Sequence, residues 1–212
     1  MNLLARRIAH LMAENANKSL YEDEIRYGLE ISLGGLLQIF VIMAVAFLLG
    51  MSKETLALIC STALYRRYSG GAHCQSYFRC TIVSLSHIIL LAYICRFIPV
   101  IHLPVYITFL AILAILIIHY YVPVDNLINP IIDKPIIRKR KQKSYWVLFL
   151  LLLISLISSY IMGEKLVAIA LLLGLFWQNI TLLPAGQAYI HLWDQLFDIL
   201  AAKFKREGVL KC

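Results

Sequence analysis

Long apolar runs alternate with short polar stretches along most of this 212-residue chain. Five runs approach the ~20 residues with which a helix crosses ~30 Å of hydrocarbon. They cover roughly residues 29–50, 81–98, 105–121, 145–162 and 166–183. A sixth run, residues 55–65, is short: it crosses by recruiting residues 51–54 or the arginine pair that follows, or it forms a re-entrant segment. The pattern predicts an all-α integral membrane protein with about six transmembrane helices.

Amphipathic segments stand at both ends of the chain. In residues 1–28, apolar side chains recur at helical spacing among charged ones, which predicts a helix that lies in the membrane interface or docks on the bundle. Acidic residues interrupt this segment and no small-residue cleavage site follows, so we do not expect a signal peptide. In residues 187–212 an apolar stripe lies opposite a polar side that includes Asp194 and Asp198, which predicts a second interfacial helix.

Composition supports the membrane assignment. Hydrophobic residues make up 61% of the chain and charged residues 15%, whereas about a quarter of an ordinary soluble domain is charged. The five cysteines, at positions 60, 74, 80, 95 and 212, are an odd and widely spaced set, which excludes a small disulfide-stapled module. No internal repeat is visible, so we expect a single polytopic membrane domain over residues 1–212.

The net charge of +8 is explained by the orientation of the chain in the membrane, because lysine and arginine collect on the cytoplasmic side. With six crossings and a cytoplasmic N-terminus, 17 of the 20 basic residues fall on the cytoplasmic side, and the others are Lys53, Arg96 and Lys165. We therefore predict a cell-membrane protein with both termini in the cytoplasm and no nucleic-acid partner. Residues 122–144 hold three prolines and a basic run at 138–143, which predicts a cytoplasmic loop that faces anionic lipid or another anion.

One polar stretch between the second and third crossings, YRRYSGGAHCQSYFRC at residues 65–80, carries the candidate chemistry. It combines thiols with an imidazole, as a cysteine nucleophile with a histidine base requires. On an unbroken helix His73 and Cys80 would lie roughly 10.5 Å apart along the axis, so we expect Gly70 and Gly71 to break the helix and fold the chain back.

Two other interpretations of this stretch stay open. The cysteines are also typical small apolar fillers, and the arginines also fix topology. A metal site formed by His73, Cys74 and Cys80 is disfavoured because the loop offers no fourth ligand, although His87 lies downstream.

The motif Arg66-Arg67-x-x-Gly70-Gly71-x-His73-x6-Cys80 between apolar segments resembles the accessory gene regulator protein B (AgrB) family. Members are membrane cysteine endopeptidases that mature a quorum-sensing peptide precursor. A Lys-Pro-Ile element with a basic cluster at residues 134–143 and the sequence Thr-Leu-Leu-Pro at 181–184 extend the similarity over nearly the whole chain.

The resemblance implies that His73 is the base and Cys80 the nucleophile, with Arg66 and Gly71 as supporting positions. Cys74 departs from the motif and leaves open which thiol reacts, although spacing favours Cys80. A dyad, or an orienting group such as Gln178 or Asn179, is expected because no acidic residue lies between Glu54 and Asp125.

The resemblance also implies the partners: a short AgrD-like precursor with an amphipathic leader and an acidic tail, membrane lipid, and a second copy in a homodimer. Arg138, Lys139 and Lys141 are candidates for binding the acidic tail. No cofactor is expected. The alternatives are a small peptide transporter or export subunit and a non-catalytic scaffold; the scarcity of acidic residues in the spans disfavours transport.

Overall fold

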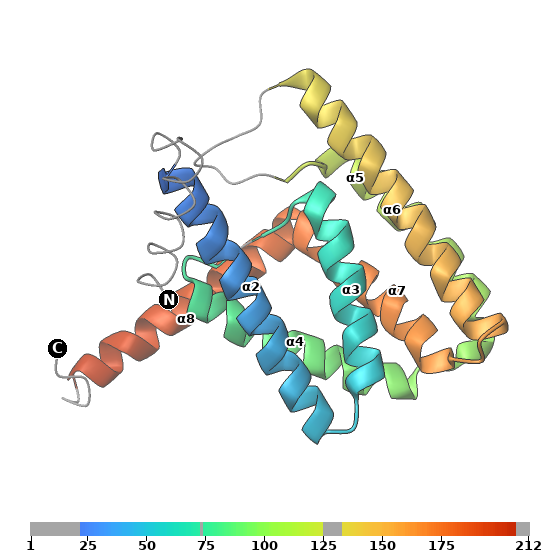
Figure 1. The fold of residues 1–212 in the computed structure, drawn as a ribbon, viewed down its shortest axis with the longest axis horizontal. Coiled ribbons are helices and arrows are strands. Elements are labelled where there is room, and N and C mark those ends of the chain that lie inside the picture. Colours follow the sequence, from blue (N-terminus) through green and yellow to red (C-terminus); the bar gives the residue numbers. More distant parts are fainter. Residues whose placement is uncertain (1–21, 73, 125–132, 207–212) are drawn as a thin grey trace.

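A computed structural model describes residues 22–72, 74–124 and 133–206 (Figure 1). Within these ranges the chain is helical, apart from loops and an isolated bridge that pairs Gly70 with Val124. The helices are α2 (Glu22–Leu48), α3 (Ser52–Ser69), α4 (Tyr77–Ile94), the 3-10 turns η2 (Cys95–Phe97) and η3 (Val100–His102), α5 (Leu103–Tyr121), α6 (Lys134–Tyr160), α7 (Lys165–Leu182) and α8 (Pro184–Arg206). The predicted all-α class is confirmed for the described residues.

Four of the described helical stretches are long and apolar enough to cross a membrane. They are Tyr77–Phe97, Val100–Tyr121, Lys134–Tyr160 and Lys165–Leu182. The apolar part of α2, Ser32–Leu48, is shorter. The protein therefore has the helices of a membrane protein, and the number of six crossings stays a prediction.

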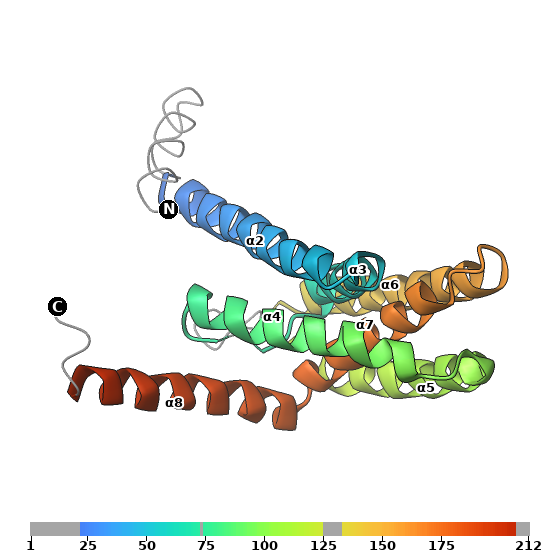
Figure 2. The same ribbon diagram turned by 90° about the horizontal axis from the view of Figure 1, so that it is seen from below.

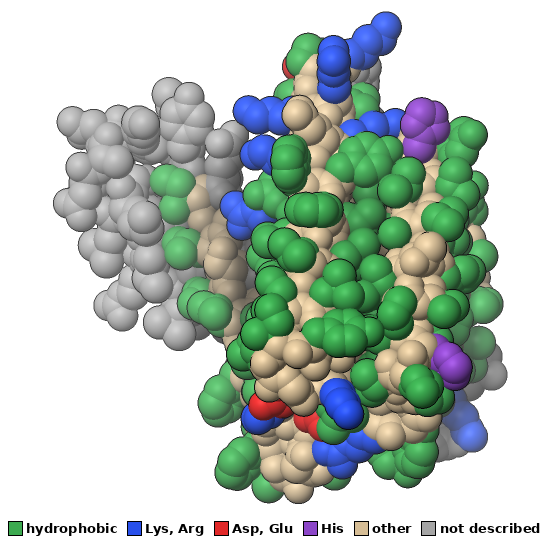
Figure 3. All heavy atoms as spheres, turned by 90° about the vertical axis from the view of Figure 1, so that its right-hand side faces the viewer, with side chains coloured by type: hydrophobic (Ala, Val, Ile, Leu, Met, Phe, Trp, Pro, Cys, Tyr) green, Lys and Arg blue, Asp and Glu red, His purple; other side chains and the backbone are tan. Residues whose placement is uncertain are grey.

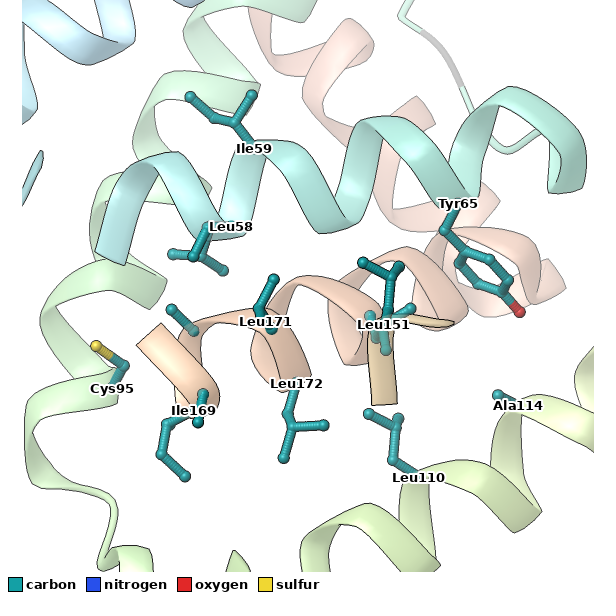
Figure 4. Packing of buried hydrophobic residues seen from close by; sticks show 14 of the residues in the cluster. Leu58, Ile59, Tyr65, Cys95, Leu110, Ala114, Leu151, Ile169, Leu171 and Leu172 are labelled. Atoms are coloured by element: carbon teal, nitrogen blue, oxygen red, sulfur yellow. The ribbon is translucent and has the colours of Figure 1, made fainter. Parts of the chain in front are cut away.

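Helix α7 forms the centre of the bundle. In its apolar window 61% of the residues are buried inside the protein, against 22–28% for the other three long apolar stretches. Figure 4 shows why: Leu58 of α3, Leu110 of α5 and Leu151 of α6 gather with Leu171 and Leu172 of α7. The other helices keep one face outside this core.

The outer faces of α5 and α6 are apolar. Phe109 and Ile112 of α5 and Trp146 and Phe149 of α6 are all well exposed. Figure 3 shows this side of the molecule, where hydrophobic side chains cover the middle and charged side chains gather toward the ends. An exposed apolar surface of this extent matches a lipid environment.

Charged groups mark the two ends of the bundle. At one end the Lys53 ammonium contacts the Glu164 carboxylate at 2.5 Å, and the Arg96 guanidinium contacts Glu54 at 3.3 Å. At the other end the Lys143 ammonium lies 5.1 Å from the centre of the Tyr68 ring. The basic start of α6 therefore lies at the end of the bundle where α3 terminates.

The structure differs from the sequence pattern in the predicted basic loop at residues 122–144. Helix α6 begins at Lys134, so the basic run forms its first turns. Pro135 occupies the first turn, where a proline is tolerated because the N–H it lacks would have no partner within the helix. The segment predicted as an interfacial helix from residue 187 is helical from Pro184. The N-terminal helix predicted within residues 1–28 lies mostly outside the described residues.

Gly174 sets how closely α3 approaches α7. A Cβ atom there would lie 1.9 Å from the Ser61 hydroxyl and 3.0 Å from the Leu58 carbonyl oxygen. We expect Gly174→Ala to destabilise the protein by about 1–3 kcal/mol, because overpacking pushes the helices apart. Thermal unfolding in detergent measures this. Gly35→Ala is the matched control, because a Cβ there meets nothing within 4 Å; equal effects of the two changes would contradict the prediction.

Candidate active site

The glycine pair ends α3, as the sequence predicts. Gly70 has φ +77° and Gly71 has φ +143°, a region that side chains with a Cβ rarely adopt. A Cβ on Gly70 would also lie 1.9 Å from the Val124 carbonyl oxygen. Helix α4 then begins at Tyr77, with the Ser76 hydroxyl accepting a hydrogen bond from the Arg79 N–H at 3.3 Å. Residues 70–72 and 74–76 therefore lie outside the helices, and we call residues 70–76 the site loop.

The first half of the site loop rests on the end of α7. The Gln178 side-chain amide donates to the Gly70 carbonyl at 2.7 Å, and the Ala72 N–H donates to the Thr181 carbonyl at 3.3 Å. The Gly71 N–H donates to the Val124 carbonyl at 3.2 Å. Gln178 is buried, so its amide is fixed against the loop. These contacts give the predicted orienting residue Gln178 a role in holding the loop backbone.

Arg66 lies beneath the site loop. Its guanidinium donates to the Ala72 carbonyl. It also interacts electrostatically with the thiols of Cys74 and Cys80. The structure thus brings Arg66, Gly71, Cys74 and Cys80 together, while His73 lies outside the described residues.

Cys80 lies in the first turn of α4, where its N–H donates to the Ser76 carbonyl at 3.0 Å. The N-terminus of a helix carries a partial positive charge, and a guanidinium nearby adds a full one. Both favour a thiolate over a thiol. The position of Cys80 therefore agrees with the prediction that it is the nucleophile.

Cys74 interacts with Cys80. The contact between the two thiols raises the pKa of the Cys74 thiol, and burial and the nearby negative charge raise it further. The two sulfurs of the motif region therefore lie close together, and the choice between them as nucleophile stays a prediction.

Asp194 of α8 reaches the second half of the site loop. Its two carboxylate oxygens accept hydrogen bonds from the Gln75 N–H at 3.1 and 3.2 Å, and its side chain is buried. The sequence pattern placed Asp194 on the polar side of a surface helix, and the structure shows that its carboxylate is buried against the site loop. The contact joins residues 119 positions apart, so no local signal could have found it.

His87 does not serve the alternative metal site. Its Nδ1 atom lies 2.6 Å from the Val83 carbonyl oxygen, and its Nε2 atom lies 2.8 Å from the Tyr189 hydroxyl. The ring also stacks on Trp177 at a centroid distance of 4.4 Å. Among the described residues, no group of three His, Cys, Asp or Glu side chains could hold a metal ion.

The predicted tail-binding residues lie on the first turns of α6. Arg138 and Lys139 line an open hollow of about 430 Å³ together with Lys134, Pro135 and Gln142. Lys141 instead donates to the His119 carbonyl at 2.7 Å, which ties α6 to the end of α5. The basic hollow is thus separate from the thiols but belongs to the same end of the bundle.

Comparison with known proteins identifies the family. The model of accessory gene regulator B (AgrB) matches residues 5–182. The chain belongs to the AgrB family. Family membership supports a role in the agr quorum-sensing system, where the family is linked to peptide processing and to an AgrD-like peptide precursor.

Relatives match most of the chain. An AgrB-like protein of Clostridium perfringens is 26% identical over 91% of this chain and 98% of its own length. An AgrB-like protein of Clostridium acetobutylicum is 23% identical over 84% of this chain and 85% of its own length. One from Listeria innocua is 31% identical over 57% of this chain and 58% of its own length. No solved structure matches this AgrB family member.

The contact between the site loop and the end of α7 can be tested by a substitution at Gly71. A Cβ there would lie 2.9 Å from the Gln178 amide nitrogen and 3.1 Å from the Thr181 hydroxyl. We expect Gly71→Ala to lift the loop and to accelerate alkylation of Cys74 by about threefold or more, because local opening exposes the thiol. Trypsin separates the two thiols for mass spectrometry, because it cuts after Arg67 and Arg79.

Gly163→Ala is the matched control for this measurement. Gly163 also has a positive φ, of +71°, but a Cβ there meets nothing within 4 Å. Its Cys74 alkylation rate should equal that of the unchanged protein. An unchanged rate in Gly71→Ala would show that the loop needs no seat on α7.

Proposed function

We propose that this AgrB family member is a cysteine endopeptidase that removes the C-terminal tail from a short AgrD-like precursor. Cys80 is the nucleophile and His73 the base. The observation that carries the proposal is the position of Cys80: it lies in the first turn of α4 and it interacts with Arg66. Family membership supports the same chemistry.

The reaction proceeds through an acyl-enzyme. The Cys80 thiolate attacks a backbone carbonyl of the precursor, and the peptide C–N bond breaks. His73, which has taken the thiol proton, returns it to the departing amine. The N-terminal part of the precursor remains as a thioester on Cys80. A cysteine thiol of the precursor then attacks this thioester, forming a cyclic thiolactone and restoring the Cys80 thiol.

Arg66 is proposed to stabilise the oxyanion of the first step. A guanidinium has five N–H donors, and the bond to the Ala72 carbonyl leaves others for a substrate oxygen. The first N–H groups of α4 have no partner within the helix and add to this field.

The proposed membrane arrangement has six crossings, with both termini and the site in the cytoplasm. Its support is the separation of charge along the bundle: the start of α6 and the end of α3 share one end, and Lys53 and Arg96 lie at the other. The apolar outer face of α5 and α6 would contact lipid. A homodimer is proposed on the family resemblance.

Replacing each thiol tests the nucleophile. We expect Cys80→Ser to lower precursor cleavage by at least about 10³-fold, because the hydroxyl is a far weaker nucleophile here. Cys74→Ser should keep cleavage within about tenfold, because Ser also donates a hydrogen bond. The measurement is tail release from a co-reconstituted AgrD-like precursor, with mass spectrometry of a thioester on the peptide that begins at Cys80.

The reverse pattern would contradict the assignment. Loss of cleavage in Cys74→Ser but not in Cys80→Ser would make Cys74 the nucleophile. Full cleavage in both variants would leave the chain a non-catalytic scaffold.

The hollow at Arg138 and Lys139 is proposed to bind the acidic tail of the precursor. We expect Arg138→Gln with Lys139→Gln to raise KM about threefold to tenfold at low salt and little at high salt, because screening already weakens the attraction there. Lys53→Gln with Lys165→Gln removes the same charge elsewhere and should leave KM unchanged. Unchanged cleavage by the first variant at both salt concentrations would leave lipid as the partner of this cluster.

A further inference from the structure

The surroundings of Cys80 consist of two pieces of chain, the site loop and the first turn of α4. Contacts with α7 and Val124 hold residues 70–72 of the loop. Beyond residue 73, the Gln75 N–H donates to both carboxylate oxygens of Asp194, and these bonds join the loop backbone to α8. The placement of this half of the loop therefore depends on α8.

Asp194 also holds the start of α4. The Arg79 guanidinium lies 3.6 Å from an Asp194 carboxylate oxygen and donates to the Asp194 backbone carbonyl at 3.1 Å. Gln75 and Arg79 stand on either side of Ser76, the residue that caps α4. A single carboxylate thus contacts both the site loop and the helical turn that ends at Cys80.

The carboxylate is costly to bury. Asp194 has a relative exposure of 1%, and a buried anion is tolerated only when hydrogen bonds and a countercharge replace water. Its neighbour Asp198 also pairs with Arg79, at 2.5 Å, but its side chain is 58% exposed. The two acids therefore share one arginine, and only the buried one reaches the site loop.

Aromatic contacts hold α8 against α4 at a position from which Asp194 reaches the site loop. The Tyr189 hydroxyl lies 2.8 Å from His87 Nε2 of α4, and Trp193 packs edge-on against the same imidazole. Figures 1 and 2 show α8 crossing the first part of α4. His87 is seven residues after Cys80, and Arg79 directly precedes Cys80. Helix α8 therefore contacts α4 both just before the thiol and two turns after it. A helix held in this way presents Asp194 as a fixed acceptor.

We infer that Asp194 is a positioning residue of the proposed endopeptidase: its carboxylate clamps the site loop to the first turn of α4 and so sets the position of Cys80. This inference rests on the proposed function. The family match ends at residue 182, before α8 begins, so the resemblance assigns Asp194 nothing.

Two variants of the full-length protein in nanodiscs test the clamp. Asp194→Ala removes the acceptor and should lower kcat for tail release about 10-fold to 100-fold with little change in KM, because displacing reacting groups slows chemistry more than binding. The same variant should speed Cys74 alkylation by about threefold or more, since the loop end is released. Asp194→Asn keeps an oxygen that accepts from Gln75 and should stay within a few-fold of the unchanged protein in both measurements.

Matched controls separate the clamp from general stability. Asp198→Asn removes only the exposed pair with Arg79, and Gln75→Ala keeps the backbone N–H, so both should leave kcat and alkylation unchanged. If Asp194→Ala does not accumulate as folded protein, Asp194→Ser takes its place, because its shorter side chain also removes the carboxylate: unchanged kcat and alkylation in this folded variant overturn the proposal. Unchanged kcat and alkylation in Asp194→Ala overturns it as well.

The same assay distinguishes the clamp from the proposed function. If Cys80→Ala still releases the tail, the endopeptidase assignment fails whatever Asp194 does. If Cys80→Ala is inactive and Asp194→Ala matches the unchanged protein, only the clamp fails.

Discussion

The packing of α3 on α7 is the contact on which the candidate site depends. Gly174 lets the two backbones approach, and the buried Tyr65 hydroxyl lies 3.2 Å from the Asn179 side-chain oxygen. Tyr65 and Asn179 each stand about one turn before the end of their helix, so the pair brings both helix ends together. The loop that follows α3 therefore contacts Gln178 and Thr181 of α7 within its first three residues. Helix packing thus positions this loop, which has no regular structure of its own.

The same packing explains why α3 is so weakly apolar for a helix inside a membrane protein. Its buried residues include Glu54, Ser61 and Ser69, which face other helices and not lipid. Hydroxyl groups on α3 bond to carbonyls of the preceding turn, as the Ser69 hydroxyl does to Tyr65 at 3.0 Å. Polar side chains are tolerated at membrane depth when the protein itself supplies their partners. The short, mostly apolar run at 55–65 consequently belongs to a helix of 18 residues.

The sequence predicted those features of the fold that depend on the residues of a single segment. The apolar runs gave α4 to α7, and the paired glycines marked the end of α3, because hydropathy and positive φ are properties of single segments. Contacts between distant segments carried no such signal. On α8 the buried face follows Ile190 and Asp194, whereas Leu196 and Leu200 of the predicted apolar stripe are exposed. Exposed leucines agree with the predicted interfacial helix, but the pattern held no sign that the partners of Asp194 are groups inside the protein, because those partners belong to distant segments.

In the candidate site, the carboxylates pair with one arginine, and a different arginine lies next to the thiols. Asp194 interacts electrostatically with the Cys74 thiol, and an uncompensated carboxylate there would oppose negative charge at the site. Arg79 neutralises it, with Asp198 as a second carboxylate partner of that arginine. The interactions that the structure gives Arg66 are with the Ala72 carbonyl and the two thiols, none of which is a carboxylate. The positive charge of Arg66 is therefore left to favour an anion at Cys80, and an acid can brace the site loop without weakening the nucleophile.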